Sequence, residues 1–181
     1  KEAGRIILKQ KIILEKFPPP ISFFIVFILW VRGGENNIKR YGMTIVVKWQ
    51  GKMAFKAITE EGHAVLMDAS PDVGGEDKGP RPMEMVLMGL GGCTGIDVVL
   101  MLQKSKQNIE GCQIEITSER SDTIPKVYSK IHVHFKVTGR GLNEKKVKRA
   151  VDLSAEKYCS VSKMLEATVV LSHDYEIIEQ A

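Results

Sequence analysis

The sequence has few cysteines, and they form no pattern that would hold a structural metal. Its 181 residues include only Cys93, Cys112 and Cys159. This odd and low count excludes a small secreted domain stapled by disulfides. The sequence contains no CxxC pair and no cluster of cysteine with histidine, which excludes a zinc site of the cysteine-rich type. These absences favour the reducing cytoplasm, with one or two chemically active thiols.

Most of the chain also lacks a strong net charge. Residues 1–42 carry eight Lys or Arg and three Asp or Glu, whereas residues 43–181 carry 18 basic and 19 acidic residues. The overall charge of +4 therefore comes from the first 42 residues. Residues 43–181 show no electrostatic footprint for nucleic acid, so we expect no nucleic-acid partner.

The N-terminal segment has no hydrophobic run long enough to span a membrane. Its densest run, ISFFIVFILWV from Ile21 to Val31, has 11 residues, whereas a spanning helix needs about 20. Three interpretations of residues 1–42 are open: an arm that binds a membrane or a partner, a signal segment, or an artefact of a misplaced start site or an added sequence. We favour the artefact and expect no membrane partner. The patterned sequence begins near Met43, which predicts one folded domain over 43–181.

Residues 43–181 carry clear patterns of secondary structure. Strands are predicted over 43–59 (two strands), 63–70, 111–122, 125–139 and 167–178, and helices over 82–107 and 142–165. No regular crossover helices separate the strands, which predicts an α+β fold with an antiparallel sheet. The first helix is apolar almost all round and is therefore expected to be buried. One small sheet can hardly cover such a helix, so we also predict a homodimer.

Residues 89–97, GLGGCTGID, place four glycines around Cys93 inside the first predicted helix. Each glycine costs about 1 kcal/mol of helix stability against alanine. If the helix breaks at Gly91–Gly92, Cys93 begins the next helical piece, where the helix dipole stabilises a thiolate. Alternatively, the glycines allow tight helix packing and Cys93 is a small core residue. Taken alone, these residues favour the packing interpretation.

Other candidate residues depend on geometry that the sequence does not show. Glu84 lies nine residues before Cys93, about 180° around a straight helix, so it reaches the thiol only across a kink. Otherwise it is an acidic residue that stabilises the start of the helix. Cys159 is the second notable thiol, and a disulfide would need Cα atoms within about 7 Å. His132 and His134 share one strand face, but two histidines without a third ligand predict no metal site.

Two segments, GPRPMEMVLMGLGGCTGIDVV and AVDLSAEKYCSVSKML, resemble the OsmC/Ohr family of osmotically inducible and organic hydroperoxide resistance proteins. The sequence is most similar to the cytosolic bacterial OsmC-like redox proteins of this family. The resemblance extends from Met43 to Ile178 and does not include residues 1–42. It implies an intertwined α+β homodimer, in which long central helices pack between curved antiparallel sheets and the active sites lie at the dimer interface.

The resemblance also implies a chemistry. Cys93 matches the peroxidatic cysteine, Cys159 the resolving cysteine and Glu84 an activating carboxylate, with no metal or organic cofactor. The substrate would be an organic hydroperoxide and the reductant an external dithiol, in a cytoplasmic defence against oxidative stress. The arginine that pairs with the glutamate in family peroxidases has no counterpart between Met43 and Pro80. That departure favours an alternative, a non-enzymatic OsmC-like dimer that binds a small apolar ligand in the same pocket.

Overall fold

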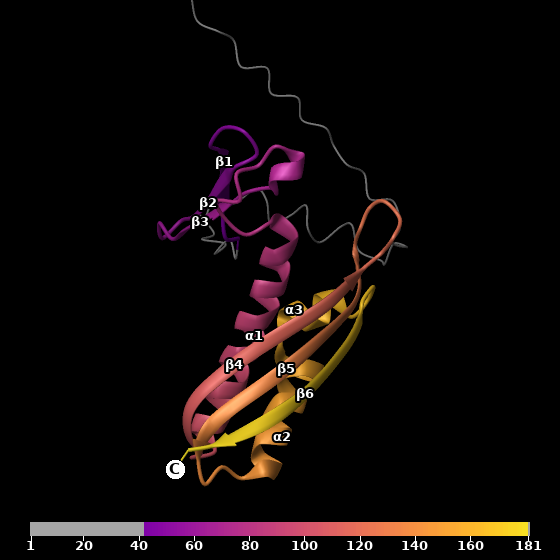
Figure 1. The fold of residues 1–181 in the computed structure, drawn as a ribbon. Coiled ribbons are helices and arrows are strands. Elements are labelled where there is room, and N and C mark those ends of the chain that lie inside the picture. The colour runs from indigo at the N-terminus through magenta and orange to yellow at the C-terminus, as the bar shows by residue number, and fades with distance from the viewer. Residues whose placement is uncertain (1–41, 181) are drawn as a thin grey trace, which may run out of the picture. The chain divides into compact units, whose positions relative to one another are not determined.

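The computed structural model describes residues 42–180, in which a compact unit begins at Met43. The predictions about residues 1–42 fall outside this range, apart from Gly42. The first sheet contains three antiparallel strands in the order β1-β2-β3: β1 (Ile45–Trp49), β2 (Phe55–Thr59) and β3 (Ala64–Met67) (Figure 1). The two strands expected over 43–59 are confirmed as β1 and β2, and Gly51 and Lys52 adopt positive φ in the turn between them.

The second sheet corrects the prediction of purely antiparallel pairing. It contains β4 (Asn108–Arg120), β5 (Tyr128–Arg140) and β6 (Val170–Glu179), in that order. The expected antiparallel pair β4–β5 is present, but β6 runs parallel to β5. The helices α2 (Glu144–Leu153) and α3 (Ser160–Leu165) lie between β5 and β6 in the chain. They form a crossover that returns the chain to the start of β5, which makes the last pair parallel.

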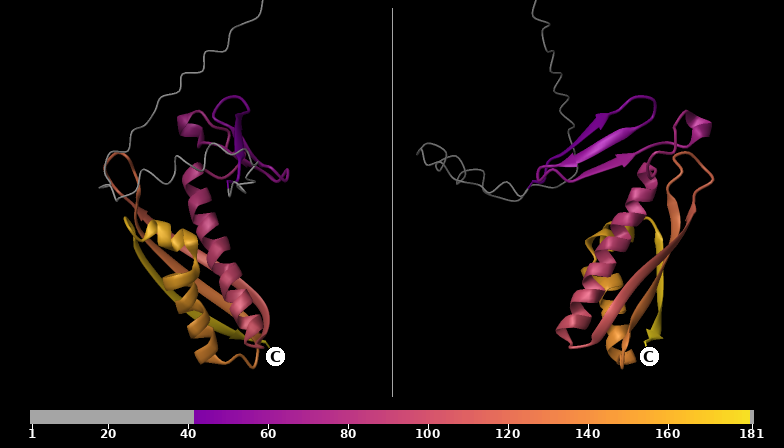
Figure 2. Two further views of the ribbon diagram at one scale, coloured as in Figure 1. Left: turned by 180° about the vertical axis from the view of Figure 1, so that it is seen from behind. Right: turned by 60° about the vertical axis from the view of Figure 1, so that its left-hand side comes forward.

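The long central helix is confirmed as α1 (Pro82–Lys104), a continuous helix of 23 residues. It lies with α2 and α3 on one face of the second sheet (Figures 1 and 2). Alternate residues of β5 point into this layer and are buried, and α1 contributes a stripe at four-residue spacing. The buried residues are Ile131, Val133, Phe135 and Val137 of β5 and Leu90, Thr94, Val98 and Leu102 of α1.

Only that stripe of α1 is buried within one chain, so burial of the whole helix stays a prediction that depends on the second subunit. The opposite side exposes Met88, Ile96 and Leu100, at 54%, 63% and 47% of their full area. By length and composition alone α1 could also cross a bilayer, a test that the core helix of a soluble protein passes as well. Because its buried stripe contacts the core of the second sheet, we interpret it as a core helix.

Two of the four glycines around Cys93 allow α1 to lie close to β4. A Cβ on Gly91 would meet the Cδ1 of Ile116 at 3.3 Å, and one on Gly95 would meet the Cγ1 of Ile114 at 3.4 Å. Larger side chains at these positions would push the helix away from the sheet. Gly89 and Gly92 have nothing within 4 Å of such a Cβ, so packing within one chain does not explain them.

The loop before α1 is organised by the buried carboxylate of Asp68. Its oxygens accept hydrogen bonds from the backbone N–H groups of Ala69 (2.8 Å), Glu76 (2.9 Å) and Lys78 (3.2 Å). These bonds, the one from Glu76 foremost, lower the pKa of Asp68. Asp68 therefore holds the loop folded back on the end of β3 and fixes where α1 begins.

The lowered pKa of Asp68 predicts an acid-dependent contribution to stability. A carboxyl whose pKa is lower in the folded state stabilises the fold above its unfolded pKa of about 3.9, and this contribution is lost as pH falls through the folded pKa. We expect Asp68→Asn to lower the free energy of unfolding at about pH 7, and the deficit to shrink below about pH 4. Urea unfolding at constant protein concentration measures this difference. Asp122→Asn, in an exposed loop, is the control; a deficit independent of pH would contradict the prediction.

Candidate active site

The structure brings Cys93 and Cys159 together from distant parts of the chain. Cys93 lies half-buried in the middle of α1, and Cys159 is fully buried at the position that precedes α3. The two side chains belong to the same hydrophobic core, and the thiol of Cys93 lies near enough to raise the pKa of Cys159. The sequence spacing did not show this proximity, which only the family resemblance implied. The third cysteine, Cys112, lies on β4.

The segment before Cys159 departs from the single helix expected over 142–165. After α2 the chain forms one π-helical stretch, Ser154–Tyr158, and Cys159 itself is extended, with φ −67° and ψ 109°. Such π-helical insertions often occur at functional sites. The interruption turns the Cys159 side chain to the start of α3, where its Sγ accepts a hydrogen bond from the backbone N–H of Ser162 at 3.4 Å. An uninterrupted helix would not give Cys159 this capping position.

Ser154 ties the π-helical stretch to α1 beside Cys93. Its buried hydroxyl lies 3.2 Å from the carbonyl oxygen of Thr94 and 3.3 Å from a carboxylate oxygen of Asp97. Its own carbonyl accepts a hydrogen bond from the N–H of Cys159 at 3.0 Å. One serine therefore links the helix of the first thiol to the backbone of the second. Ser154 lies within the helix expected over 142–165, and a serine among its apolar residues was the only sequence signal for this role.

The environment of Cys159 keeps its thiol protonated. Burial raises its pKa, the neighbouring Cys93 side chain raises it further, and the hydrogen bonds from Ser162 act in the opposite direction. Burial likewise raises the pKa of Cys112. Because thiolate is the nucleophilic form, a thiol held in its protonated state suits a second-step partner better than the group that attacks first.

Glu84 is not brought to Cys93 within one chain, because the kink at Gly91–Gly92 that would allow it is absent from the continuous helix α1. The two residues lie about 13 Å apart along the helix axis and on opposite sides of it. Glu84 instead accepts a hydrogen bond from the backbone N–H of Arg81 at 2.8 Å and pairs with its guanidinium at 3.0 Å. Both interactions lower the pKa of Glu84. Its role as an activating carboxylate therefore stays a prediction.

The lysines of the first sheet do not replace the missing arginine in the contacts observed. Lys52 pairs with Glu76 at 2.8 Å, whereas Arg81, in the loop before α1, provides the cation that reaches Glu84. An arginine and a glutamate are thus paired at the start of α1, although the arginine comes from a different segment than the resemblance implied. The planar guanidinium suits a carboxylate better than an ammonium group would.

A pocket adjoins the two-cysteine region on the side facing β6. Its lining, from α1, β5, the segment 155–169 and β6, does not include either cysteine and mixes apolar side chains with polar and charged ones: Leu90, Val133, Ala155, Val169, Val170 and Leu171 beside Thr94, Glu156, Ser162, Lys163, Glu166, Ser172 and His173. Leu90 and Thr94 flank Cys93 in the sequence, and Ser162 donates to Cys159. The pocket gives a small amphipathic molecule a place to bind near the thiols.

Comparison with known proteins agrees with this architecture. The family model described as OsmC-like protein matches residues 75–174. Protein YhfA of Escherichia coli (strain K12) is 49% identical over 132 residues, which are 73% of this chain and 96% of that protein. A hypothetical protein from Aquifex aeolicus VF5 is 28% identical, with a TM-score of 0.68 over 77% of this chain and 98% of the other.

A more distant neighbour is an organic hydroperoxide resistance protein OsmC from Legionella pneumophila. It is 16% identical, with a TM-score of 0.56 over 78% of this chain and 98% of the other, a likeness of fold alone. The α+β fold, with a long central helix and two small sheets, is that of OsmC-like proteins. This chain belongs to the OsmC-like family.

Proposed function

We propose that this protein is a cysteine-dependent reductase of organic hydroperoxides, with Cys93 as the peroxidatic and Cys159 as the resolving cysteine. The observation that carries the proposal is the proximity of the two thiols in the folded chain. The family includes proteins named for organic hydroperoxide resistance. The proposed setting is the reducing cytoplasm, where an external dithiol would regenerate the enzyme.

The proposed reaction has three balanced steps. The Cys93 thiolate attacks the O–O bond of ROOH, takes one oxygen to become sulfenic acid and, with one proton, releases ROH. The Cys159 thiol then condenses with the sulfenic acid to form the Cys93–Cys159 disulfide and water. Finally, an external dithiol reduces this disulfide by exchange and is itself oxidised.

The positions of the two thiols support this division of roles. Cys93 is half-buried and therefore more accessible to a peroxide than the fully buried Cys159. The raised pKa of Cys159 keeps its thiol protonated, and this proton becomes part of the water formed in the second step. The apolar surroundings of Cys93, which packs against the hydrophobic core, favour an alkyl hydroperoxide over hydrogen peroxide.

We further propose that the protein acts as a homodimer. One face of the first sheet exposes a continuous group of large apolar side chains: Ile45, Val47, Trp49, Phe55 and Val65. The outer side of α1 exposes a second group, around Ile96. Contiguous groups of exposed apolar side chains such as these mark a protein–protein interface in soluble proteins. A second copy of the chain would cover both groups. In the proposed dimer, the partner subunit's Arg81–Glu84 pair would lie near Cys93 of the first chain.

The proposal is tested by one equivalent of an organic hydroperoxide, such as cumene hydroperoxide, added to the reduced protein. We expect a rapid Cys93–Cys159 disulfide, with Cys112 left free, when the cysteines are mapped by mass spectrometry. The reaction of a small-molecule thiol under the same conditions is the control for rate. If all three thiols stay free on a timescale where that thiol has barely reacted, the proposal is wrong and the ligand-binding dimer is favoured.

A further inference from the structure

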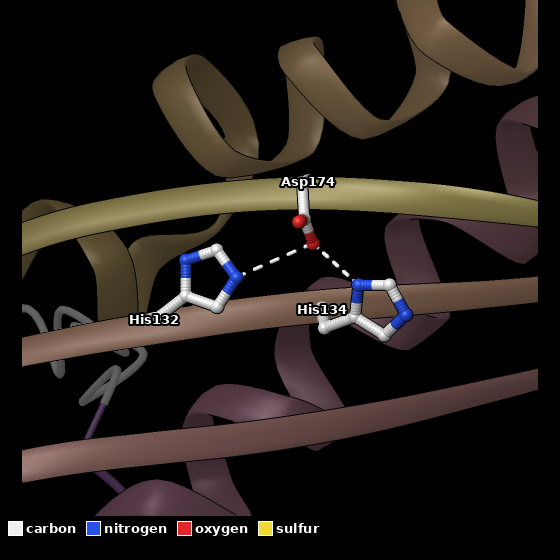
Figure 3. A group of neighbouring side chains, drawn as sticks. All are labelled: His132, His134 and Asp174. Carbon is white, nitrogen blue, oxygen red and sulfur yellow. Dashed lines mark hydrogen bonds and ion pairs between the residues drawn. The ribbon is translucent and has the colours of Figure 1, made fainter.

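Three potential metal ligands converge on the outer face of the second sheet, away from the helices (Figure 3). His132 and His134 come from β5 and Asp174 from β6. One carboxylate oxygen of Asp174 lies 3.3 Å from the Nε2 of His132 and also contacts the Nδ1 of His134. The three ligand atoms all lie within 4.8 Å of one another.

The sheet register brings these side chains together. His132 and His134 are two residues apart on one strand, so both point to the same face. Their neighbours on the inner face, Ile131 and Val133, are buried in the core and prevent the strand from turning over. In the parallel pair β5–β6, Asp174 lies directly beside His134. The arrangement is therefore built on two regular strands and does not depend on a mobile loop.

Each histidine also has a partner for its second ring nitrogen. The Nδ1 of His132 lies 2.9 Å from the hydroxyl of Ser172, and the Nε2 of His134 lies 3.7 Å from a carboxylate oxygen of Glu176. Histidines that bind metals usually interact through the other ring nitrogen with a carboxylate or another polar group, which fixes the tautomer and the ring orientation. With a metal bound, Ser172 and Glu176 would take this supporting role.

We propose that His132, His134 and Asp174 bind a divalent transition-metal ion of the zinc class. The ligands would be the Nε2 of His132, the Nδ1 of His134 and a carboxylate oxygen of Asp174, with water in the remaining position. Two imidazoles and one carboxylate form a ligand set that suits Zn²⁺ and its neighbours in the first transition row. Metal–ligand bonds of about 2.0–2.1 Å place ligands about 3.4 Å apart in a tetrahedral site, close to the 3.3 Å observed between His132 and Asp174. The same oxygen lies closer than this to the Nδ1 of His134, so these two ligands would move apart to admit the ion.

The surrounding charges favour a cation at this position. Glu176 lies beyond His134, and Glu115 is the cross-strand neighbour of His134 on β4. Lys136 pairs with both glutamates, at 2.8 Å and 3.6 Å. The two glutamates and Asp174 carry three negative charges, and Lys136 carries one positive charge. The cluster is therefore acidic when the histidines are neutral. A bound ion would offset this charge and tie the edge strand β6 to the central strand β5.

The alternative to a metal site is a surface cluster in which the two histidines only form hydrogen bonds with Asp174. Such exposed pairs contribute little to stability, and they require no ion. The alternatives differ in metal stoichiometry and in ligand identity, both of which can be measured on the full-length chain without a polyhistidine tag.

A Co²⁺ titration of the reduced protein tests the proposal, because the absorption of bound Co²⁺ distinguishes nitrogen and oxygen ligands from thiolates. We expect one Co²⁺ per chain without thiolate-to-metal bands, and displacement of the Co²⁺ by Zn²⁺. His132→Ala, His134→Ala and Asp174→Ala should each weaken binding more than about 10-fold, and Ser172→Ala, which removes a supporting contact, about 10-fold. His63→Ala, at an exposed histidine outside the cluster, is the matched control.

Three results would overturn the proposal. The first is Co²⁺ binding with thiolate bands, which would assign the ion to the cysteines. The second is binding that survives all three ligand substitutions. The third is no binding below millimolar metal by a protein whose circular dichroism spectrum shows it to be folded. As an independent measurement, Zn²⁺ should raise the unfolding temperature of the wild type and of His63→Ala but not of the three ligand variants, because a ligand stabilises only the state that binds it.

Discussion

Replacing Cys93 with serine is expected to abolish peroxide reduction, with a loss of turnover on the order of 10³-fold or more, as when the nucleophile of a covalent mechanism is removed. A serine hydroxyl has nearly the shape of the thiol and should preserve the packing of α1. It forms no sulfenic acid, however, so both the oxygen transfer and the disulfide are lost. Turnover is measured as consumption of an alkyl hydroperoxide in the presence of excess dithiol. Thermal unfolding shows whether the variant is folded.

Two further variants separate the roles of the cysteines. Cys159→Ser should consume about one equivalent of peroxide and then stop with Cys93 trapped as sulfenic acid, because the second thiol is missing. Cys112→Ser should retain turnover, because Cys112 lies on β4 outside the two-cysteine region. Turnover by Cys93→Ser would rule out Cys93 as the peroxidatic residue. Loss of turnover in Cys112→Ser equal to that in Cys93→Ser would show that packing, not chemistry, limits the reaction.

Local patterns were enough to predict most of the elements of this fold. Strict alternation predicted the β4–β5 hairpin, because buried Ile131, Val133 and Phe135 alternate with polar residues. The apolar run after Pro82 predicted α1. The direction of β6 was not predictable in the same way, because a strand pattern carries no information on whether its partner is parallel. That depends on where the crossover through α2 and α3 delivers the chain.

The candidate sites depended on contacts between residues distant in the sequence. Cys93 and Cys159 were recognised as a pair only by the resemblance, because the π-helical stretch that turns Cys159 inward has no distinctive sequence pattern. His132 and His134 were correctly predicted to share a face, and a metal site was rejected for want of a third ligand. Asp174 is that third candidate ligand, and only the register of β5 against β6 places it beside them.

The exposed side of α1 predicts a second large effect, the loss of the proposed homodimer in Ile96→Lys. Ile96 lies between Met88 and Leu100 on this side and is 63% exposed in one chain. A Cβ added to Gly89 or Gly92 would meet nothing within 4 Å, so these glycines leave room beside Ile96 for the backbone of a partner helix. A lysine in the middle of such an apolar interface would be an uncompensated buried charge. Its cost of about 3–5 kcal/mol corresponds to a dimer dissociation constant about 10²–10⁴-fold higher.

The same substitution should hardly affect the single chain, and this contrast makes the experiment decisive. Exposed substitutions change stability by about 0.5 kcal/mol or less, and lysine favours a helix at least as well as isoleucine. Light scattering coupled to size-exclusion chromatography should show a wild-type dimer and an Ile96→Lys monomer that remains folded. Ile124→Lys, at a 91% exposed position in the β4–β5 loop, is the control and should remain dimeric. A monomeric wild type, or a dimeric Ile96→Lys, would contradict the proposed interface. If the partner completes the site beside Cys93, peroxide turnover should fall together with the dimer.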